Sequence, residues 1–210
     1  TQLIEKTIGD ERSAHIGFGT SGIVFDLPMA LLEVIFQIED SRNYYLLRHI
    51  INFVFFFISV FVFFKLINKR FNSWSLSTIG SIFLVLSPRI FANSFYNNKD
   101  IIFMSLFIMG LYAAINFLEN KNIKSAVIFA FISALMINLR ILGLILPALI
   151  FLFYIINLLS DKNNVRKAFI PLIFFLFLTP VFLILFWPYL WENPIDNFVL
   201  TIKNLSEHNL

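Results

Sequence analysis

Long apolar windows constrain this chain more than any other feature of its sequence. The run FVFFFISVFVFF at 53–64 contains no charged residue, and comparable runs recur downstream. A membrane-spanning helix needs about 20 predominantly apolar residues. About six windows meet or approach that length, at 46–64, 75–93, 101–118, 124–140, 141–159 and 168–187. The sequence therefore predicts an all-α fold, a polytopic transmembrane helical bundle of about six spans.

Composition excludes the main soluble alternatives. Of the 210 residues, 59% are hydrophobic and 14% are charged, whereas a typical soluble domain has about 25% charged residues. The 28 phenylalanines are more than one soluble core of this size can bury. The lack of cysteine excludes disulfides and thiolate metal sites. No basic stripe of the kind that binds nucleic acid is present, so we expect membrane lipid and no nucleic acid among the partners.

Basic residues in the short loops predict the orientation of the bundle. The loops near 65–74, 119–124 and 160–167 fall on one side of the membrane if each window crosses it. Their basic residues are Lys65, Lys69, Arg70, Lys121, Lys124, Lys162, Arg166 and Lys167. By the positive-inside rule this side is the cytoplasm. The 94–100 loop, the 139–143 turn and both end segments then lie on the extracytoplasmic side.

Segment 22–38 is apolar but interrupted, and it predicts a helix that lies along the outer interface. Asp26 and Pro28 stand at its start, where an N-cap acid and an early proline belong, and Glu33 interrupts its apolar face. A short packing helix is the alternative. In the following segment, SRNYYLLRH, Arg48 lies deeper than Arg42, and snorkelling and a role in a site both remain open for it.

We expect one partial domain, 1–210. It divides into an outer loop at 1–21, the interfacial helix at 22–38, the transmembrane bundle at 46–187 and an outer segment at 188–210. In this topology the N-terminal segment lies outside the cytoplasm with no span before it to export it. An upstream transmembrane helix is therefore expected.

Polar residues gather in the stretch SPRIFANSFYNNKDIIF, 87–103, between two apolar windows. Arg89 follows a proline near the outer end of the second window, where a charge is costly unless it is paired or hydrated. Lys99 and Asp100 open the third window, and a helix N-terminus favours an acid there. Helix capping by Asp100 and snorkelling of Lys99 would explain these two residues without a site.

Arg140 tips the interpretation towards a site, because it arrives from another outer turn with apolar neighbours on both sides. An ionisable residue in such a position is a functional candidate by default. The planar guanidinium matches the geometry of a phosphate. We therefore predict that Arg89, Lys99 and Arg140 together cradle a phosphate or pyrophosphate, beside Asp100.

The segment FWPYLWENPIDNF, 186–198, carries aromatic residues next to acids. Trp187, Tyr189 and Trp191 suit the membrane surface, and aromatic planes beside Glu192 also suit sugar binding. Anchoring at the interface is the alternative and accounts for most of the aromatic residues by itself.

The order of these motifs resembles the bacterial GT-C glycosyltransferases, in the branch similar to dolichyl-phosphate-mannose protein mannosyltransferases and aminoarabinose transferases. The order is an acid–Pro helix start, a span, the 87–103 stretch, LRILGL and FWPYLWENP. The resemblance extends from about Gly17 to Phe198 and is strongest at 87–103 and 186–194. It implies many transmembrane helices with a site at the outer face, where a sugar is transferred from a polyprenyl phosphate to an acceptor.

The resemblance also implies roles for particular residues. Asp100 matches the acid that begins the helix after the second outer loop, and Arg140 matches the basic residue expected to touch the lipid phosphate. The FDLP segment takes the place of the family's Lys/His-Pro-Pro loop but holds one proline and no lysine or histidine. The family's catalytic carboxylate lies in the first outer loop, where Asp10 and Glu11 form the only acidic pair. If that acid instead lies upstream of Thr1, this chain by itself would be inactive.

The resemblance thus implies an inverting glycosyltransferase of a bacterial plasma membrane, with its site on the extracytoplasmic side. The catalytic candidates are Asp100, Asp10 and Glu11. The candidates for binding substrate or phosphate are Arg140, Lys99, Arg89, Asp26 and Glu192. We expect a polyprenyl-phosphate-linked sugar as donor and an envelope glycan, lipid or protein as acceptor. No metal ligands are assigned, and a divalent cation remains an open alternative.

Two rival interpretations belong to other functional classes. A flippase or transporter of lipid-linked sugars would place its charges near the bilayer midplane and show internal repeats. A structural subunit of an envelope complex would tolerate loss of the clustered charges. The gathering of charges at one face, without an internal repeat, favours the enzyme.

Overall fold

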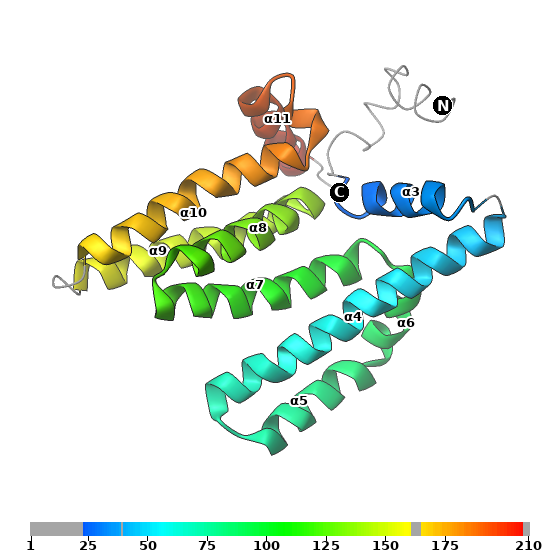
Figure 1. Cartoon of the computed structure of the whole chain (residues 1–210), viewed down its shortest axis with the longest axis horizontal. Helices are drawn as coiled ribbons and strands as arrows, with labels where there is room; N and C mark the ends of the chain where they lie inside the picture. The colour runs from blue at the N-terminus through cyan, green and yellow to red at the C-terminus, as the bar shows by residue number, and fades with distance from the viewer. Residues whose placement is uncertain (1–22, 39, 161–164, 208–210) are drawn as a thin grey trace.

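The computed structural model describes residues 23–38, 40–160 and 165–207, and within these ranges it contains helices and no strand (Figure 1). Two 3₁₀ turns, η1 (Ile141–Leu144) and η2 (Pro188–Leu190), connect longer helices. The α-helices are α3 (Asp26–Ile35), α4 (Ser41–Phe71), α5 (Trp74–Leu86), α6 (Pro88–Tyr96), α7 (Asp100–Asn120), α8 (Ile123–Leu139), α9 (Ile145–Ser160), α10 (Val165–Leu185) and α11 (Pro194–Glu207).

The lengths of these helices confirm the predicted polytopic bundle. Within the described residues, four segments are long and apolar enough to cross a membrane: 41–71, 100–120, 141–159 and 168–185. The pair α5 and α6 passes the same test jointly but is bent by 66°, and α8 is apolar but shorter. Large aromatic side chains such as Phe57 and Phe83 face outward, which a lipid environment accommodates.

The predicted second span, 75–93, is divided in two at Pro88. Proline disfavours the α conformation in the residue before it, and Ser87 is extended, with φ −61° and ψ 111°. The α6 helix therefore starts afresh with its proline in the first turn. Asn52 in α4 fixes the new direction, because its buried Nδ2 donates to the carbonyl of Ser94 at 2.9 Å.

The core lies where α7, α8, α9 and α10 meet. Phe117 stacks on Tyr154 with ring centroids 4.7 Å apart, and Phe129 stacks on Phe175 at 5.0 Å. Small buried residues on α7 and α8 allow the helices to approach closely; they are Ser105, Ala113, Ala114, Ala126, Ala130, Ser133 and Ala134. This close packing makes α7 and α8 rigid supports for whatever their ends carry.

Ion pairs join the helix ends at both ends of the bundle. Lys69 near the end of α4 pairs with Glu119 near the end of α7 at 2.6 Å. At the opposite end, Asp100 at the start of α7 pairs with Arg140 after α8. The beginnings of α4 and α7 and the ends of α8 and α10 thus lie together, with α3 near them, on the right-hand side of Figure 1.

Candidate functional site

Arg140 and Asp100, which lie 40 residues apart in the sequence, form an ion pair between α8 and α7 through Nη2 and Oδ1. The α8 helix stops at Arg140, whose backbone is extended, and the chain turns back through η1. Gly143 makes that turn fit, because a Cβ there would lie 2.6 Å from the backbone carbon of Met136. The tight return against α8 is what aims Arg140 at the start of α7.

Asn97 holds the other partner of this pair. Its Oδ1 accepts from the backbone N–H of Asp100 at 3.0 Å, and its Nδ2 donates to Asp100 Oδ2 at 2.9 Å. Asn93 extends the chain of contacts by accepting from Asn97 Nδ2 at 3.2 Å. Both carboxylate oxygens of Asp100 are therefore engaged, one by Asn97 and one by Arg140.

The pair is exposed and contributes little to stability. The side chains of Arg140 and Asp100 are 43% and 55% exposed. Ion pairs in such positions contribute roughly 0–1 kcal/mol. A guanidinium presents several N–H donors in one plane, and Asp100 accepts from a single nitrogen. The remaining donors of Arg140 can therefore bind an anion without breaking the contact with Asp100.

A second charged cluster joins α3 to α4. Arg48 donates from Nη1 to Asp26 at 3.1 Å and from Nε to Glu33 at 3.2 Å, and its guanidinium lies 4.6 Å from the centre of the Tyr44 ring. Sequence reasoning treated Glu33 as an interruption and Arg48 as undecided. The available signal was the spacing of Asp26 and Glu33, because two acids seven residues apart share one face of a helix.

An apolar cavity of about 270 Å³ lies between α3, the middle of α4, the first turns of α7, the second half of α8 and the residue that follows α10. Its lining residues are Ile23, Val24, Phe25, Leu27, Pro28, Met29, Phe55, Ile102, Leu106, Phe131, Leu135 and Phe186. Asp26 lies between two lining residues in the chain, and Asp100 precedes the lining residue Ile102 by two positions. Each ion cluster thus includes an acid that is within two positions of a lining residue in the chain, and no charged side chain among the described residues lines the cavity itself.

The other two predicted cations, Arg89 and Lys99, form no ion pair with Asp100. Arg89 is exposed in the first turn of α6, and Lys99 is exposed just before α7. Within the described part of the chain, neither side chain forms an ion pair. The cavities found among the described residues include none that Arg89, Lys99 and Arg140 share. A phosphate cradle formed by the three cations together therefore stays a prediction.

The remaining predicted residues have other positions. Asp26 is not an N-cap, because Phe25 takes that position without a side-chain bond, and Asp26 faces Arg48 instead. Glu192 is exposed between η2 and α11. Trp187 is 1% exposed and packs on α8, so its ring is not available to a sugar. Asp10 and Glu11 lie outside the described residues.

Asn138, two residues before Arg140, was missed at the level of sequence. It is 1% exposed, and within the described chain neither its amide nitrogen nor its amide oxygen has a partner. Leaving a buried polar group unpaired costs about 1–3 kcal/mol. The sequence signal was an amide side chain inside an apolar window.

The described residues contain no group of three histidines or carboxylates that could hold a metal ion.

Comparison with known proteins identifies a family for this chain. The family described as dolichyl-phosphate-mannose-protein mannosyltransferase matches residues 27–191. This range runs from α3 to the end of η2 and includes both Asp100 and Arg140. No similar curated protein and no similar solved structure was found.

Proposed function

Because this chain belongs to the dolichyl-phosphate-mannose-protein mannosyltransferase family, and is thus a membrane glycosyltransferase of the GT-C type, we propose that it uses a sugar carried on a polyprenyl phosphate. The acceptor is an envelope glycan, lipid or protein. The reaction takes place on the extracytoplasmic side of a bacterial plasma membrane, at the end of the bundle where Arg140 meets Asp100.

The observation that supports this proposal is that the Arg140–Asp100 pair and an apolar cavity lie at the same end of the bundle. A polyprenyl phosphate has an apolar tail and an anionic head, and the two features match these two parts of the structure. The first units of the tail lie against Ile102, Phe131 and Leu135. The phosphate binds the guanidinium edge that Asp100 leaves open.

Arg140 then supplies the electrostatic part of the catalysis. Transfer breaks the bond between the sugar C1 and the phosphate oxygen, and the electron pair stays on the phosphate. A fixed cation stabilises that growing negative charge more than it stabilises the bound donor, which is what accelerates a reaction. Asn97 contributes by holding Asp100, which in turn holds Arg140 in position.

Asp100 has two roles under this proposal. It orients Arg140 in the free protein. A carboxylate oxygen can accept more than one hydrogen bond, so Oδ1 of Asp100 can keep its contact with Arg140 and also act as the general base that accepts the proton of the acceptor hydroxyl. The acceptor oxygen then forms the new bond to C1 from the face opposite the phosphate, which inverts the configuration. Asp10 and Glu11 remain the alternative candidates for this base.

The outlying residues have weaker roles. Arg89 and Lys99 attract the anionic headgroup through long-range electrostatics and do not hold it. Asp26 positions α3 through Arg48 and so shapes one wall of the cavity. Glu192 stays a candidate for contacting sugar hydroxyls. The membership of the family favours an enzyme over a flippase or a structural subunit, because the family is one of transferases.

The test is sugar transfer in membranes that contain the full-length protein and the lipid-linked sugars of its host. Arg140→Gln removes the cation and should lower the transfer rate by about 100-fold or more, the usual cost of one group that stabilises developing charge. Arg70→Gln removes an exposed cation at the opposite end of the bundle and serves as the matched control. Transfer by the Arg140→Gln protein at the rate of this control would overturn the proposal.

A further inference from the structure

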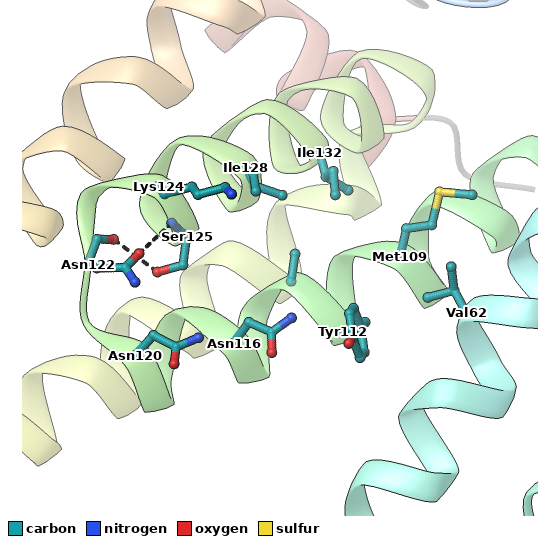
Figure 2. A pocket seen from close by; sticks show the side chains of 11 residues that line it. Val62, Met109, Tyr112, Asn116, Asn120, Asn122, Lys124, Ser125, Ile128 and Ile132 are labelled. Carbon is teal, nitrogen blue, oxygen red and sulfur yellow. Dashed lines mark hydrogen bonds between the residues drawn. The ribbon is translucent and has the colours of Figure 1, made fainter.

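A second pocket lies at the other end of α7, between α4 and α8, with a volume of about 460 Å³. Figure 2 shows its floor on α7 and its walls on α8 and α4. The α7 helix has 21 residues, which corresponds to about 30 Å at 1.5 Å per residue. The polar end of the pocket, at Asn120, is therefore about 30 Å from Asp100 along the helix, and its apolar end, at Met109, is about 14 Å away.

The lining of this pocket changes from apolar to polar along the helix axis. Met109 and Ala113 line the part nearer the middle of α7, and Asn116 and Asn120 line the part nearer its end. The spacing of four, three and four residues keeps all of them on one face. On α8 the same order is repeated, with Ile132 and Ile128 deeper and Ser125, Lys124 and Asn122 at the end. A ligand with an apolar chain and a polar head fits such a gradient.

The polar end of the pocket offers the side-chain NH₂ groups of Asn116 and Asn122 as hydrogen-bond donors, because the side-chain oxygens of these two residues already have partners. Asn116 Oδ1 accepts from Lys69 Nζ at 2.5 Å, and Asn122 Oδ1 accepts from the backbone N–H of Ser125 at 2.8 Å. Each amide keeps its NH₂ group as a donor, and no described residue accepts from either. A head group with several acceptor oxygens suits these donors.

The charge at this end favours an anion. Lys124 runs along α8 at the rim of the pocket (Figure 2), and no carboxylate among the described residues pairs with it. The nearby acid, Glu119, forms its ion pair with Lys69. The basic residues described at this end are Lys65, Lys69, Arg70, Lys121 and Lys124. Basic clusters at a membrane surface attract anionic lipids.

We propose that this pocket binds one anionic glycerophospholipid of the surrounding membrane. Its phosphate contacts Lys124 and the NH₂ groups of Asn116 and Asn122. One acyl chain lies in the deeper part, against Met109, Ile128 and Val62, and ties the inner halves of α4, α7 and α8 together. The proposal does not depend on the transferase mechanism, because the pocket shares no residue with the Arg140 site.

The experiment is native mass spectrometry of the full chain, purified from vesicles made of equal parts phosphatidylglycerol and phosphatidylcholine. The unmodified protein should retain one phosphatidylglycerol in preference to phosphatidylcholine. Lys124→Gln should lower the retained fraction about fivefold, the effect of one basic residue at an anionic membrane surface. Ile128→Trp should also lower it, because the larger ring fills the apolar part while the charge stays the same.

Lys65→Gln is the matched control, since Lys65 is exposed at the same end but lies outside the pocket. It should retain the lipid, as should Arg140→Gln. Retention in the Lys124→Gln and Ile128→Trp proteins equal to that of the unmodified chain would overturn the proposal. Equal losses in the two lysine variants would also overturn it, because they would indicate a diffuse charge effect. Replacement of phosphatidylglycerol by added polyprenyl phosphate would make the carrier lipid the occupant instead.

Discussion

Replacing Arg48 with methionine is expected to loosen α3 from the rest of the bundle. Arg48 reaches Asp26 at 3.1 Å and Glu33 at 3.2 Å, and both acids belong to α3. Methionine preserves much of the packing of the arginine stem, which can matter as much as the charge. The change therefore isolates the loss of the cation. Glu33, whose side chain is 19% exposed, keeps a carboxylate without its described partner.

The expected loss of stability follows from how exposed the side chains of Glu33 and Asp26 are. Removing one partner of a fully buried ion pair costs about 3–5 kcal/mol. Glu33 retains some contact with solvent, and the contact to Asp26, 59% exposed, falls in the range of about 0–1 kcal/mol for surface pairs. We expect Arg48→Met to lower the free energy of unfolding by about 2–3 kcal/mol. Adding Glu33→Gln to that variant removes the stranded charge and should recover about half of the loss.

The assay is denaturant unfolding of the full chain in detergent, with hydrogen exchange to locate the change. Arg42→Met is the matched control, because Arg42 lies exposed on the same helix and forms no ion pair with a described residue. Faster exchange should be confined to α3 and the first turns of α4. The reasoning about this cluster is wrong if Arg48→Met has the same free energy of unfolding as the Arg42→Met control. It is also wrong if the double variant Arg48→Met/Glu33→Gln is less stable than Arg48→Met alone.

Three further changes test the supports of the site and the unpaired amide. Gly143→Ala places a Cβ about 2.6 Å from the backbone of α8 and should cost about 1–3 kcal/mol in unfolding experiments; Gly80→Ala meets only the tip of a flexible isoleucine side chain and should cost less. Asn97→Ala removes both bonds to the first residue of α7 and should cost about 1 kcal/mol, as loss of a cap does, with weaker binding of polyprenyl phosphate; Asn98→Ala, beside it, should leave binding intact. Asn138→Leu replaces a buried amide that has no partner among the described residues, so the free energy of unfolding should stay the same or rise; a loss above about 1 kcal/mol would show that the amide is paired.

Helices and their approximate ends could be predicted from the sequence, because apolar windows of this length permit little else in a membrane. The division of the second window at Pro88 follows from the same local rules. The ion pair between Asp100 and Arg140 could be anticipated as a convergence at one face. The sequence could not show that Asp100 is the partner of Arg140. The direction of the Arg140 side chain depends on the turn at Gly143, and that turn depends on contact with the α8 backbone.

The features that were missed depend on how helices dock. Trp187 occurs in a motif typical of a membrane surface, yet it is buried against α8 because α8 and α10 pack along their length. Arg89 and Lys99 are close to Asp100 in sequence, and the structure shows both exposed without an ion pair to a described residue. The pairing of Arg48 with Glu33 requires the fold-back between α3 and α4. Sequence spacing gives the face of each helix and not the neighbour that the face meets.

The most direct measurement is the affinity of the purified full chain for polyprenyl phosphate without a sugar, compared between the unmodified protein, Arg140→Gln and Asp100→Asn. The account predicts that Arg140→Gln binds at least about tenfold more weakly, the effect of about 1.4 kcal/mol. It also predicts that Asp100→Asn binds more weakly than the unmodified protein, but by a smaller factor than Arg140→Gln, because the guanidinium keeps its charge and loses the carboxylate that holds it in position. Equal affinity in the unmodified and Arg140→Gln proteins would contradict the assignment of the lipid phosphate to Arg140.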